Sequence, residues 1–279
     1  MDLVLVISRV LSTGEKKMTF AYFDCFSGIA GDMILGALLH LGVKEAVLKK
    51  ELQKLPLNGY NLRVQKIKSN HITATDVSII VTEDQQHRSL SEINSIISRS
   101  SLQPHIKKQS KDIFFKLGSA EAKIHDIEIE EVHFHEVGAV DSIIDIIGSV
   151  IGLSLLKVNN VMCSPLPLGH GFITCEHGLL PLPAPATVEL LQGIPVYTVE
   201  KNQETVTPTG AAIITTLSSG FGEMPLMKIS RIGYGSGKIP STYPNLLRVF
   251  FGELEKKPKN QNTRKKGKNK ELYPSIVPI

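Results

Sequence analysis

The chain has 279 residues, of which 42% are hydrophobic, and carries a formal net charge of +4 at pH 7. Eight of its 31 Lys and Arg residues lie between Lys256 and Lys270, where no acid occurs, so the rest of the chain has 23 bases against 27 acids. The body is therefore slightly acidic. This argues against nucleic acid as a partner, because nucleic-acid-binding folds carry basic patches among their structural elements.

The cysteines and the apolar segments indicate a soluble, cytoplasmic protein. Cys25, Cys163 and Cys175 are odd in number and form no CxxC pair, so no disulfide framework is expected and a reducing compartment fits. The apolar start "LVLVISRVL" lacks the small-residue cleavage site of a signal peptide. The run "SIIDIIGSVIGLSLL" is too short and too interrupted to span a bilayer, so no membrane partner is expected.

The two ends of the chain differ from the body in composition. Residues 1–17 end in the polar break "STGEKK", after which Met18 opens a clean strand, so we expect Met18 to be the true start and the preceding residues to be a non-native or disordered extension. Residues 253–279 are rich in Lys, Asn, Gln and Pro and are expected to be a disordered basic tail, because they cannot bury enough apolar surface to fold. The folded body is therefore predicted over residues 18–252, as one or two subdomains.

Within this body the hydrophobic pattern alternates between strand and helix periods. Ser89 followed by Glu92 is a capping-box pattern that predicts a helix start. Strands and helices intermix throughout, so the predicted class is α/β (or α+β), with a mixed sheet and helices. The predicted strands cover 19–24, 60–69, 72–83, 159–164, 194–199, 226–234 and 245–251. The predicted helices cover 32–40, 43–54, 89–100 with Ser89 as the N-cap, 103–124 and 138–157, with short helices after Pro185 and Pro208.

The stretch "HFHEVGAVDSIIDIIG" contains five side chains that could bind a metal. His133 and His135 would point to one face of an extended segment, and Asp141 and Asp145 would share one face of the following helix, with Glu136 between the two pairs. Imidazole and carboxylate together suit a divalent metal such as Zn, Ni, Co or Mn. The alternative is ordinary helix punctuation, because acids in a first helical turn are favoured by the helix dipole. A carboxylate within "IIDII" nevertheless needs a partner if it is buried.

A second candidate is the glycine-rich turn in "FDCFSGIAGDMILGALLHLG". Ser27, Gly28 and Gly31 lie between a strand and a helix, where exposed backbone N–H groups can bind an anion. Asp24 at the strand end and Asp32 at the helix start could hold a cation or a hydroxyl. Tight strand-to-helix turns use glycine in any case, so the pattern alone leaves a purely structural role open.

A third candidate is the segment "PLGHGFITCEHGLLPLPAPAT". His170 lies between glycines in a predicted loop, and Cys175 and His177 are two residues apart. Together they could form a soft metal site. A buried inert cysteine and surface histidines explain the same residues equally well.

A fourth candidate is the helix start in "ETVTPTGAAII". Thr207 or Thr209 could cap this helix, and the backbone around Thr209 and Gly210 could then bind phosphate or carboxylate. A plain capping role for the threonines is the competing interpretation.

Taken together and in this order, these motifs resemble one family. The strings "YFDCFSGIAGDMILGALL", "HRSLSEI", "HFHEVGAVDSIIDIIG", "HGLLPLPAPAT" and "VTPTGAAI" are similar to those of the nickel insertion proteins of nickel-pincer cofactor synthesis, the LarC family. The resemblance covers about residues 18–252.

The resemblance implies a nickel chelatase, or cyclometallase, of the lyase class. Such a protein inserts Ni²⁺ into pyridinium-3,5-bisthiocarboxylic acid mononucleotide in a CTP-dependent reaction with Mg²⁺ or Mn²⁺, and the product is the cofactor of lactate racemase and related enzymes. Nickel must be held by ligands that release it to the substrate's sulfurs, and imidazole and carboxylate suit this transit role. A base must also take the ring C–H proton, for which Glu136 or Asp141 is a candidate. The expected metal ligands are His133, His135, Asp141, Asp145, His170 and His177, and the expected cofactor-binding residues are Ser27, Gly28, Gly31, Asp32, Thr209 and Gly210.

This chain departs from the family pattern in one respect. Full-length members continue with a further folded C-terminal region, which in some members is a separate or frame-shifted product, and they are expected to be homo-oligomers. Activity of this chain alone is in doubt if the CTP site lies in that region. Two other classes stay open, namely a binuclear metal-dependent phosphohydrolase and a non-catalytic nickel-binding or scaffold subunit.

Overall fold

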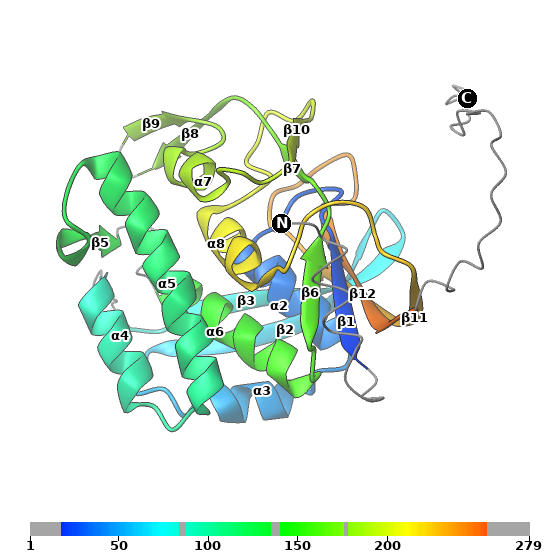
Figure 1. Cartoon of the computed structure of the whole chain (residues 1–279), viewed down its shortest axis with the longest axis horizontal. Coiled ribbons are helices and arrows are strands. Elements are labelled where there is room, and N and C mark those ends of the chain that lie inside the picture. Colours follow the sequence, from blue (N-terminus) through cyan, green and yellow to red (C-terminus); the bar gives the residue numbers. More distant parts are fainter. Residues whose placement is uncertain (1–17, 84–87, 135–139, 176–177, 256–279) are drawn as a thin grey trace, which may run out of the picture.

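The computed structural model describes residues 18–83, 88–134, 140–175 and 178–255, and Figure 1 shows how their elements are arranged. The helices are α2 (Gly31–His40), α3 (Glu45–Leu52), α4 (Leu90–Arg99), α5 (Pro104–His125), α6 (Val140–Leu155), α7 (Pro185–Leu190) and α8 (Pro208–Leu217), with a 3-10 turn η1 (Ile129–Glu131). The main sheet contains β1 (Thr19–Asp24), β2 (Tyr60–Ser69), β3 (Ile72–Val81), β6 (Asn160–Cys163), β11 (Met227–Ser236) and β12 (Leu246–Leu254). Three two-stranded pairs complete the described structure: β4 (Arg88–Ser89) with β5 (His133–Phe134), β7 (Leu166–Leu168) with β10 (Val196–Thr198), and β8 (Phe172–Cys175) with β9 (Gly178–Pro181).

The main sheet has six strands in the order β2-β3-β11-β12-β1-β6. β6 is parallel to β1 and β3 is parallel to β11, whereas β12 is antiparallel to both β1 and β11. The strands β1, β6, β11 and β3 therefore run in one direction. Ligands of open α/β sheets bind beyond the carboxyl ends of the parallel strands. We call the edge formed by the ends of β1, β6 and β11 the carboxyl end of the sheet.

Helix α2 lies unusually close to the sheet because the facing strand residues are glycines. A Cβ atom on Gly235 of β11 would lie 1.8 Å from the carbonyl oxygen of Met33, and one on Gly233 would lie 2.3 Å from that of Ala37. Only a glycine at these two positions permits this approach. The packing fixes the start of α2 beside the carboxyl end of β11.

Helix α6 packs parallel to α2 through a second set of glycines. A Cβ on Gly152 of α6 would lie 2.9 Å from Leu38 Cδ1, and one on Gly31 of α2 would lie 2.6 Å from Asp145 Cβ. Gly31 precedes Leu38 in α2, and their respective partners, Asp145 and Gly152, follow the same order in α6. The first turns of α2 and α6 therefore lie at the same end of the molecule.

The two faces of the main sheet have separate apolar clusters. Side chains on successive strand residues point to opposite faces, and in β1 Ala21 and Phe23 belong to the large core shared with the helices. On the other face Phe20 and Tyr22 pack with Met162 of β6 in a smaller cluster. The helices thus bury mainly one face of the sheet.

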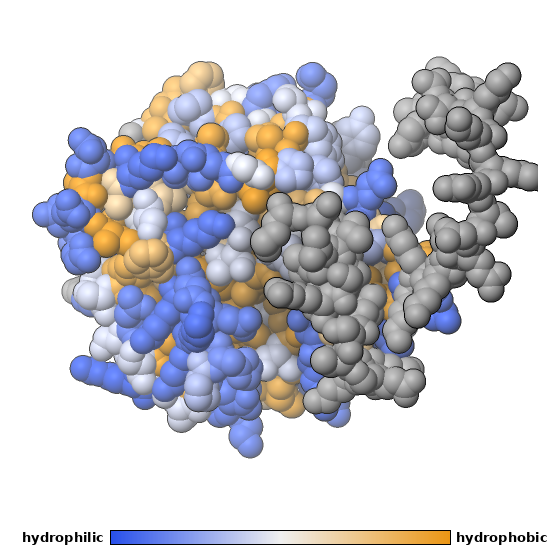
Figure 2. Space-filling model, in the orientation of Figure 1, coloured by the Kyte–Doolittle hydropathy of each residue, from blue (hydrophilic) through white to orange (hydrophobic). Residues whose placement is uncertain are grey.

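The outward face of α5 is the solvated side of an amphipathic helix. Figure 2 shows hydrophilic side chains gathered over this part of the surface. An i,i+4 ion pair joins Lys108 Nζ to Asp112 Oδ2 at 2.6 Å, and both side chains are exposed. Such a pair is worth only about 0.3–0.5 kcal/mol. In the part of the chain that the structure describes, no helix is both long and apolar enough to cross a membrane.

The fold confirms the predicted α/β class and most predicted elements. The capping box of α4 is present, with Ser89 Oγ accepting from the Glu92 N–H and Glu92 Oε2 accepting from the Ser89 N–H. The β8–β9 hairpin and the short β7 were not predicted, because a strand of three or four residues gives too little alternation to recognise. Strand β12 runs to Leu254, two residues into the predicted tail, since Leu254 packs on the smaller apolar cluster. Residues 1–17 and 256–279 lie outside the described residues, so their predicted disorder stays a prediction.

Candidate functional site

The predicted glycine turn and the predicted α8 start lie side by side at the carboxyl end of the sheet. The Ile29 N–H donates to the carbonyl of Thr205 at 2.8 Å, and the Thr207 N–H donates to the carbonyl of Ile29 at 3.1 Å. Gly28 has φ +119°, and a Cβ there would lie 1.9 Å from the Thr205 carbonyl oxygen. Glycine is therefore required at Gly28 by both its backbone conformation and the space available.

The α8 start is capped by Thr207, and not by Thr209. Thr207 Oγ1 accepts from the Gly210 N–H at 3.1 Å, which is ordinary N-capping. A Cβ on Gly210 would lie 2.5 Å from the Ile29 carbonyl oxygen, so this glycine allows the glycine turn to pack on α8. Because the Gly210 N–H already has a partner and Thr209 is buried, the structure gives these two residues a packing role at this helix start.

Three carboxyl groups and one lysine meet beside the start of α2, and we call Asp32, Asp76, Asp145 and Lys238 the acidic cluster. Lys238 follows β11, and its Nζ pairs with Asp76 of β3 and lies 3.9 Å from Asp32 Oδ2. The pairing of Gly235 with Thr75 brings the end of β11 next to Asp76. Sequence reasoning missed Asp76 and Lys238. The available signal was an acid inside the otherwise apolar strand "ITATDVSIIV".

Asp145 is the most perturbed member of the acidic cluster. Its Oδ2 lies 2.7 Å from where a Cβ on Gly31 would be, so the carboxyl group occupies the space that the glycine leaves at the start of α2. Its Oδ1 is buried and has no hydrogen-bond partner among the described residues. Burial raises the pKa of Asp145 well above its usual value, the charges of Asp32 and Asp141 raise it further, and Lys238 opposes them.

Asp32 is perturbed in the same direction. Its side chain is 16% exposed, and burial raises its pKa from 3.8 to about 6, against the opposing charge of Lys238 and with a further increase from Asp76. A carboxyl group in this range changes charge near neutral pH, which is the property expected of a general base. The cluster therefore contains a carboxyl group whose pKa is raised toward neutrality beside a second, fully buried one.

Asp141, a predicted metal ligand and catalytic residue, lies in the first turn of α6 and is exposed. Its Oδ1 accepts from the N–H of Ser142 at 2.8 Å. This arrangement fits the alternative interpretation of Asp141, an acid at an ordinary helix start. Asp141 reaches the acidic cluster only through its charge, which acts on Asp145.

Asp24, which the sequence offered with Asp32 as a possible holder of a cation or a hydroxyl, pairs with an arginine in the described structure. The strand register places Asp24 opposite Arg248 of β12, and Arg248 Nε donates to Asp24 Oδ2 at 2.8 Å. This pairing holds the pKa of Arg248 above its usual value, although burial acts against it. The guanidinium thus neutralises Asp24 at the strand end.

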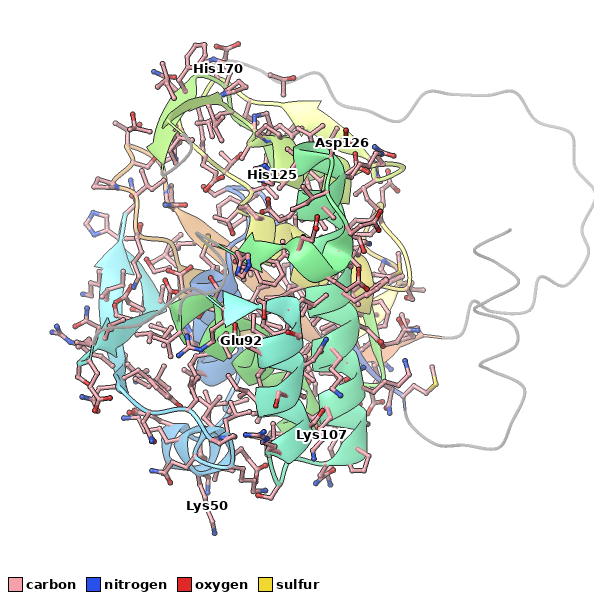
Figure 3. The ribbon with its side chains drawn as sticks, turned by 90° about the vertical axis from the view of Figure 1, so that its left-hand side faces the viewer. Lys50, Glu92, Lys107, His125, Asp126 and His170 are labelled. Carbon is pink, nitrogen blue, oxygen red and sulfur yellow. The ribbon has the colours of Figure 1, made fainter. Side chains whose placement is uncertain are left out.

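The predicted histidine ligands are dispersed in the described structure. His133 lies exposed on β5 opposite Ser89, the N-cap of α4, and His170 lies in an exposed loop with Nε2 3.5 Å from Glu200 Oε2. Figure 3 shows His170 far from Glu92, in the first turn of α4. Within the described ranges, no three His, Cys, Asp or Glu side chains are arranged to hold a metal ion. His135, Glu136 and His177 lie outside these ranges.

Two buried thiols lie next to the glycine turn. Cys25 Sγ and Cys163 Sγ are 3.5 Å apart at the ends of β1 and β6, and both cysteines are free. Burial raises the pKa of Cys25 well above its usual value. The Cys25 thiol therefore stays protonated and behaves as a small apolar side chain.

Two hollows among the described residues are lined by other parts of the fold. One, of about 380 Å³, is lined by residues near the end of α6 and the start of β6, and the other, of about 310 Å³, is formed by α3 and the start of β2. Neither contains a member of the acidic cluster. We identify the candidate site by its chemistry, because carboxyl groups with perturbed pKa values near the carboxyl ends of the parallel strands of an α/β sheet are typical of functional sites.

The fold and site define an α/β protein with a glycine turn, a capped helix start and an acidic cluster at one end of its sheet. The model of the family described as "Nickel insertion protein" matches residues 21–272, and the chain belongs to this family. No solved structure matches the chain.

Several curated relatives carry the name "Pyridinium-3,5-bisthiocarboxylic acid mononucleotide nickel insertion protein". One from Desulfitobacterium hafniense is 48% identical over 250 residues, which cover 90% of this chain and 62% of the relative. The one from Acetivibrio thermocellus is 47% identical over 253 residues, which cover 87% of this chain and 62% of the relative. The chain thus spans somewhat less than two thirds of the length of these relatives.

Proposed function

We propose that this protein takes part in inserting nickel into pyridinium-3,5-bisthiocarboxylic acid mononucleotide, in the biosynthesis of the nickel-pincer cofactor. The observation that carries the proposal is membership of the nickel insertion family over residues 21–272, together with the names of relatives that share almost half of its residues. The acidic cluster adds support, because the reaction needs oxygen ligands and a proton acceptor.

Nickel is the cargo of this reaction, and its ligands on the protein must release it. Carboxylate oxygens hold a divalent cation less firmly than thiolates do, so a carboxylate site favours transfer to the two sulfurs of the substrate. In the acidic cluster Lys238 is the resident cation beside Asp32 and Asp76. We propose that an arriving Ni²⁺ displaces the Lys238 ammonium from these carboxylates. We further propose an entry step, in which nickel is bound at the protein surface before it reaches the acidic cluster. The proposed ligands of this entry step are His133, His135, Asp141, His170 and His177.

The bond between nickel and the ring carbon forms as the ring C–H bond breaks, so one proton must leave the substrate. Asp32 is our proposed acceptor, because its pKa of about 6 leaves it ionised at neutral pH and more basic than an ordinary carboxylate. Asp145, whose burial disfavours the charged form, is placed to share that proton. Glu136 and Asp141 are the alternatives named from the sequence.

The proposal includes further components. CTP hydrolysis with Mg²⁺ or Mn²⁺, the lyase-type classification, a cytoplasmic location and a homo-oligomeric full-length form belong to it. The chain spans 62% of the relatives named above, and we propose that the remaining region supplies the CTP-dependent step. This chain alone is then expected to bind nickel with little or no CTP hydrolysis.

The test is nickel transfer to the bisthiocarboxylate mononucleotide, followed by absorbance, with and without CTP and the C-terminal region of a relative. We expect insertion only when all components are present, and an Asp32→Asn variant should lose insertion at least tenfold. Asp112→Asn, which alters an exposed carboxylate on α5, is the matched control. Robust insertion by Asp32→Asn would exclude Asp32 as the base.

Turnover of generic phosphoesters with Mn²⁺ or Zn²⁺, without insertion, would favour the phosphohydrolase. Nickel binding without insertion in the complete mixture would favour the scaffold subunit.

A further inference from the structure

Lys201 lies over the glycine turn, and no acid among the described residues pairs with it. Its Nζ donates to Ser27 Oγ at 2.7 Å and approaches the Ser27 carbonyl oxygen at 3.5 Å. Ser27 is 2% exposed and Lys201 is partly buried. In the part of the chain that the structure describes, Lys201 forms no ion pair, and burial lowers its pKa below the usual value. A partly buried ammonium without a counter-charge is unfavourable unless a ligand supplies one.

Two other lysines show how such a charge is ordinarily compensated. Lys238 lies between the carboxylates of Asp32 and Asp76. Lys116, which is also partly buried with a lowered pKa, donates to the Thr215 carbonyl at 3.0 Å. That carbonyl belongs to the last turn of α8, where the helix dipole is negative. The partners of Lys201 are a hydroxyl and one distant carbonyl, and these do not neutralise it.

The backbone around Lys201 is held in place. The His170 N–H donates to the Lys201 carbonyl at 2.9 Å, and the Lys201 N–H donates to the Val199 carbonyl at 2.8 Å. A Cβ on Gly169 would lie 2.8 Å from the Lys201 carbonyl oxygen, so that glycine permits close packing of the two loops. Lys201 is thus positioned by the fold and does not lie over Ser27 by the chance extension of a surface side chain.

Charges of opposite sign follow one another along the glycine turn. The Lys201 ammonium lies at Ser27, and the acidic cluster begins four residues later, where Asp145 lies against Gly31 and Asp32 opens α2. A mononucleotide has a phosphate at one end and its base at the other. The order of charges therefore fits a phosphate on the lysine side and a metal-binding ring on the carboxylate side.

We propose that Lys201, together with the hydroxyl of Ser27, binds the phosphate of the pyridinium mononucleotide and so directs its ring toward Asp32 and Asp145. This inference rests on the proposed function and adds to it the residue that supplies the positive charge. An ammonium has three N–H donors, so Lys201 can keep its bond to Ser27 Oγ while it donates to a phosphate oxygen. The negative charge of the phosphate compensates the Lys201 ammonium, so binding raises the pKa of Lys201 toward its usual value.

The test compares two probes that differ only in the phosphate. Nicotinic acid mononucleotide and nicotinic acid riboside share the pyridinium ring and the ribose, and their affinities can be measured by calorimetry without nickel or CTP. We expect the wild-type protein to bind the mononucleotide at least tenfold more tightly than the riboside. Lys201→Met should remove this preference and leave the affinity for the riboside unchanged.

Two further variants make the result specific. Lys116→Met removes a comparable partly buried ammonium elsewhere and should keep the full preference, whereas Lys201→Arg retains the charge and should keep part of it. Circular dichroism should show that all three variants are folded. A Lys201→Met protein that still prefers the mononucleotide would overturn the inference, as would a wild-type protein with no preference.

The outcome is separable from that of nickel insertion. Loss of the phosphate preference in Lys201→Met, in a protein that inserts no nickel under any condition, would support the phosphate site and contradict the proposed reaction. Unimpaired insertion at low substrate concentration by Lys201→Met would contradict the phosphate site alone.

Discussion

Replacing Asp32 by Asn should increase the stability of this protein at neutral pH. The carboxyl group of Asp32 has a pKa of about 6 in the folded protein, against 3.8 as the ordinary value. A carboxyl group with a raised pKa binds its proton more tightly in the folded state, so the folded state loses stability as pH rises from about 4 to about 6. A shift of about two units corresponds to about 3 kcal/mol, at about 1.36 kcal/mol per unit. Only 16% of the side chain is exposed, so solvent screening reduces this figure little.

Asparagine keeps the size of Asp32 and can still accept at the helix start through its amide oxygen. It removes the charge that burial and Asp76 disfavour, although it also removes the attraction to Lys238. We therefore expect Asp32→Asn to raise the free energy of unfolding by up to about 3 kcal/mol at pH 7 and to change it little near pH 4. The gain in stability would accompany a loss of activity, as is common for residues of functional sites.

The assay is urea unfolding of the wild type and the variant at a series of pH values from 4 to 7.5. Asp112→Asn is the control, because its carboxylate is 47% exposed and pairs only with Lys108 on the same helix. That control should change stability by less than about 0.5 kcal/mol at every pH. A difference between Asp32→Asn and the wild type that stays constant with pH, or a loss of stability at pH 7, would refute the reasoning.

Three further predictions follow from the same geometry. Gly31→Ala should lower the free energy of unfolding by about 1–3 kcal/mol, because its Cβ would lie 2.6 Å from Asp145 Cβ; urea unfolding checks this, and an unchanged midpoint would contradict the packing. Thr207→Ala should cost about 1 kcal/mol through loss of the α8 cap, with Thr207→Ser as a variant that should retain it. The double change of His133 and His135 to Ala should weaken nickel binding in calorimetry by at least roughly tenfold with thermal stability little changed, since His133 is exposed; nickel affinity equal to that of the wild type would remove both histidines from the entry step.

Local patterns in the sequence determined most of the secondary structure and, through it, the fold class. The strands at 60–69 and 72–81 alternate over ten residues each, and helix α4 opens on a capping box that involves only Ser89 and Glu92. Periodicity and capping act within about ten residues of the chain, so they are legible before any tertiary contact is known. The short β8–β9 hairpin was not predicted, because strands of four residues show too little alternation of apolar and polar side chains.

Only the tertiary structure decided which charged groups meet. The prediction grouped Asp145 with Asp141 and the histidines, its neighbours in sequence, and the fold adds contacts from distant segments, because Asp145 lies against Gly31 and its pKa responds to Asp32 as well as to Asp141. The pairing of Asp24 with Arg248 was not predicted, because strand register joins residues 224 positions apart.

The physical reason is that burial and proximity belong to the packed chain. The carboxyl group of an aspartate acquires a strongly raised pKa when helices and strands from distant segments of the chain exclude water from it. The acidic cluster contains residues from α2, β3 and α6 and from the segment after β11. The glycines that allow these elements to approach one another give no signal in the sequence of which element will pack on them. The sequence by itself therefore identified the family and the elements, and the packing of α2 against β11 and α6 determined the site.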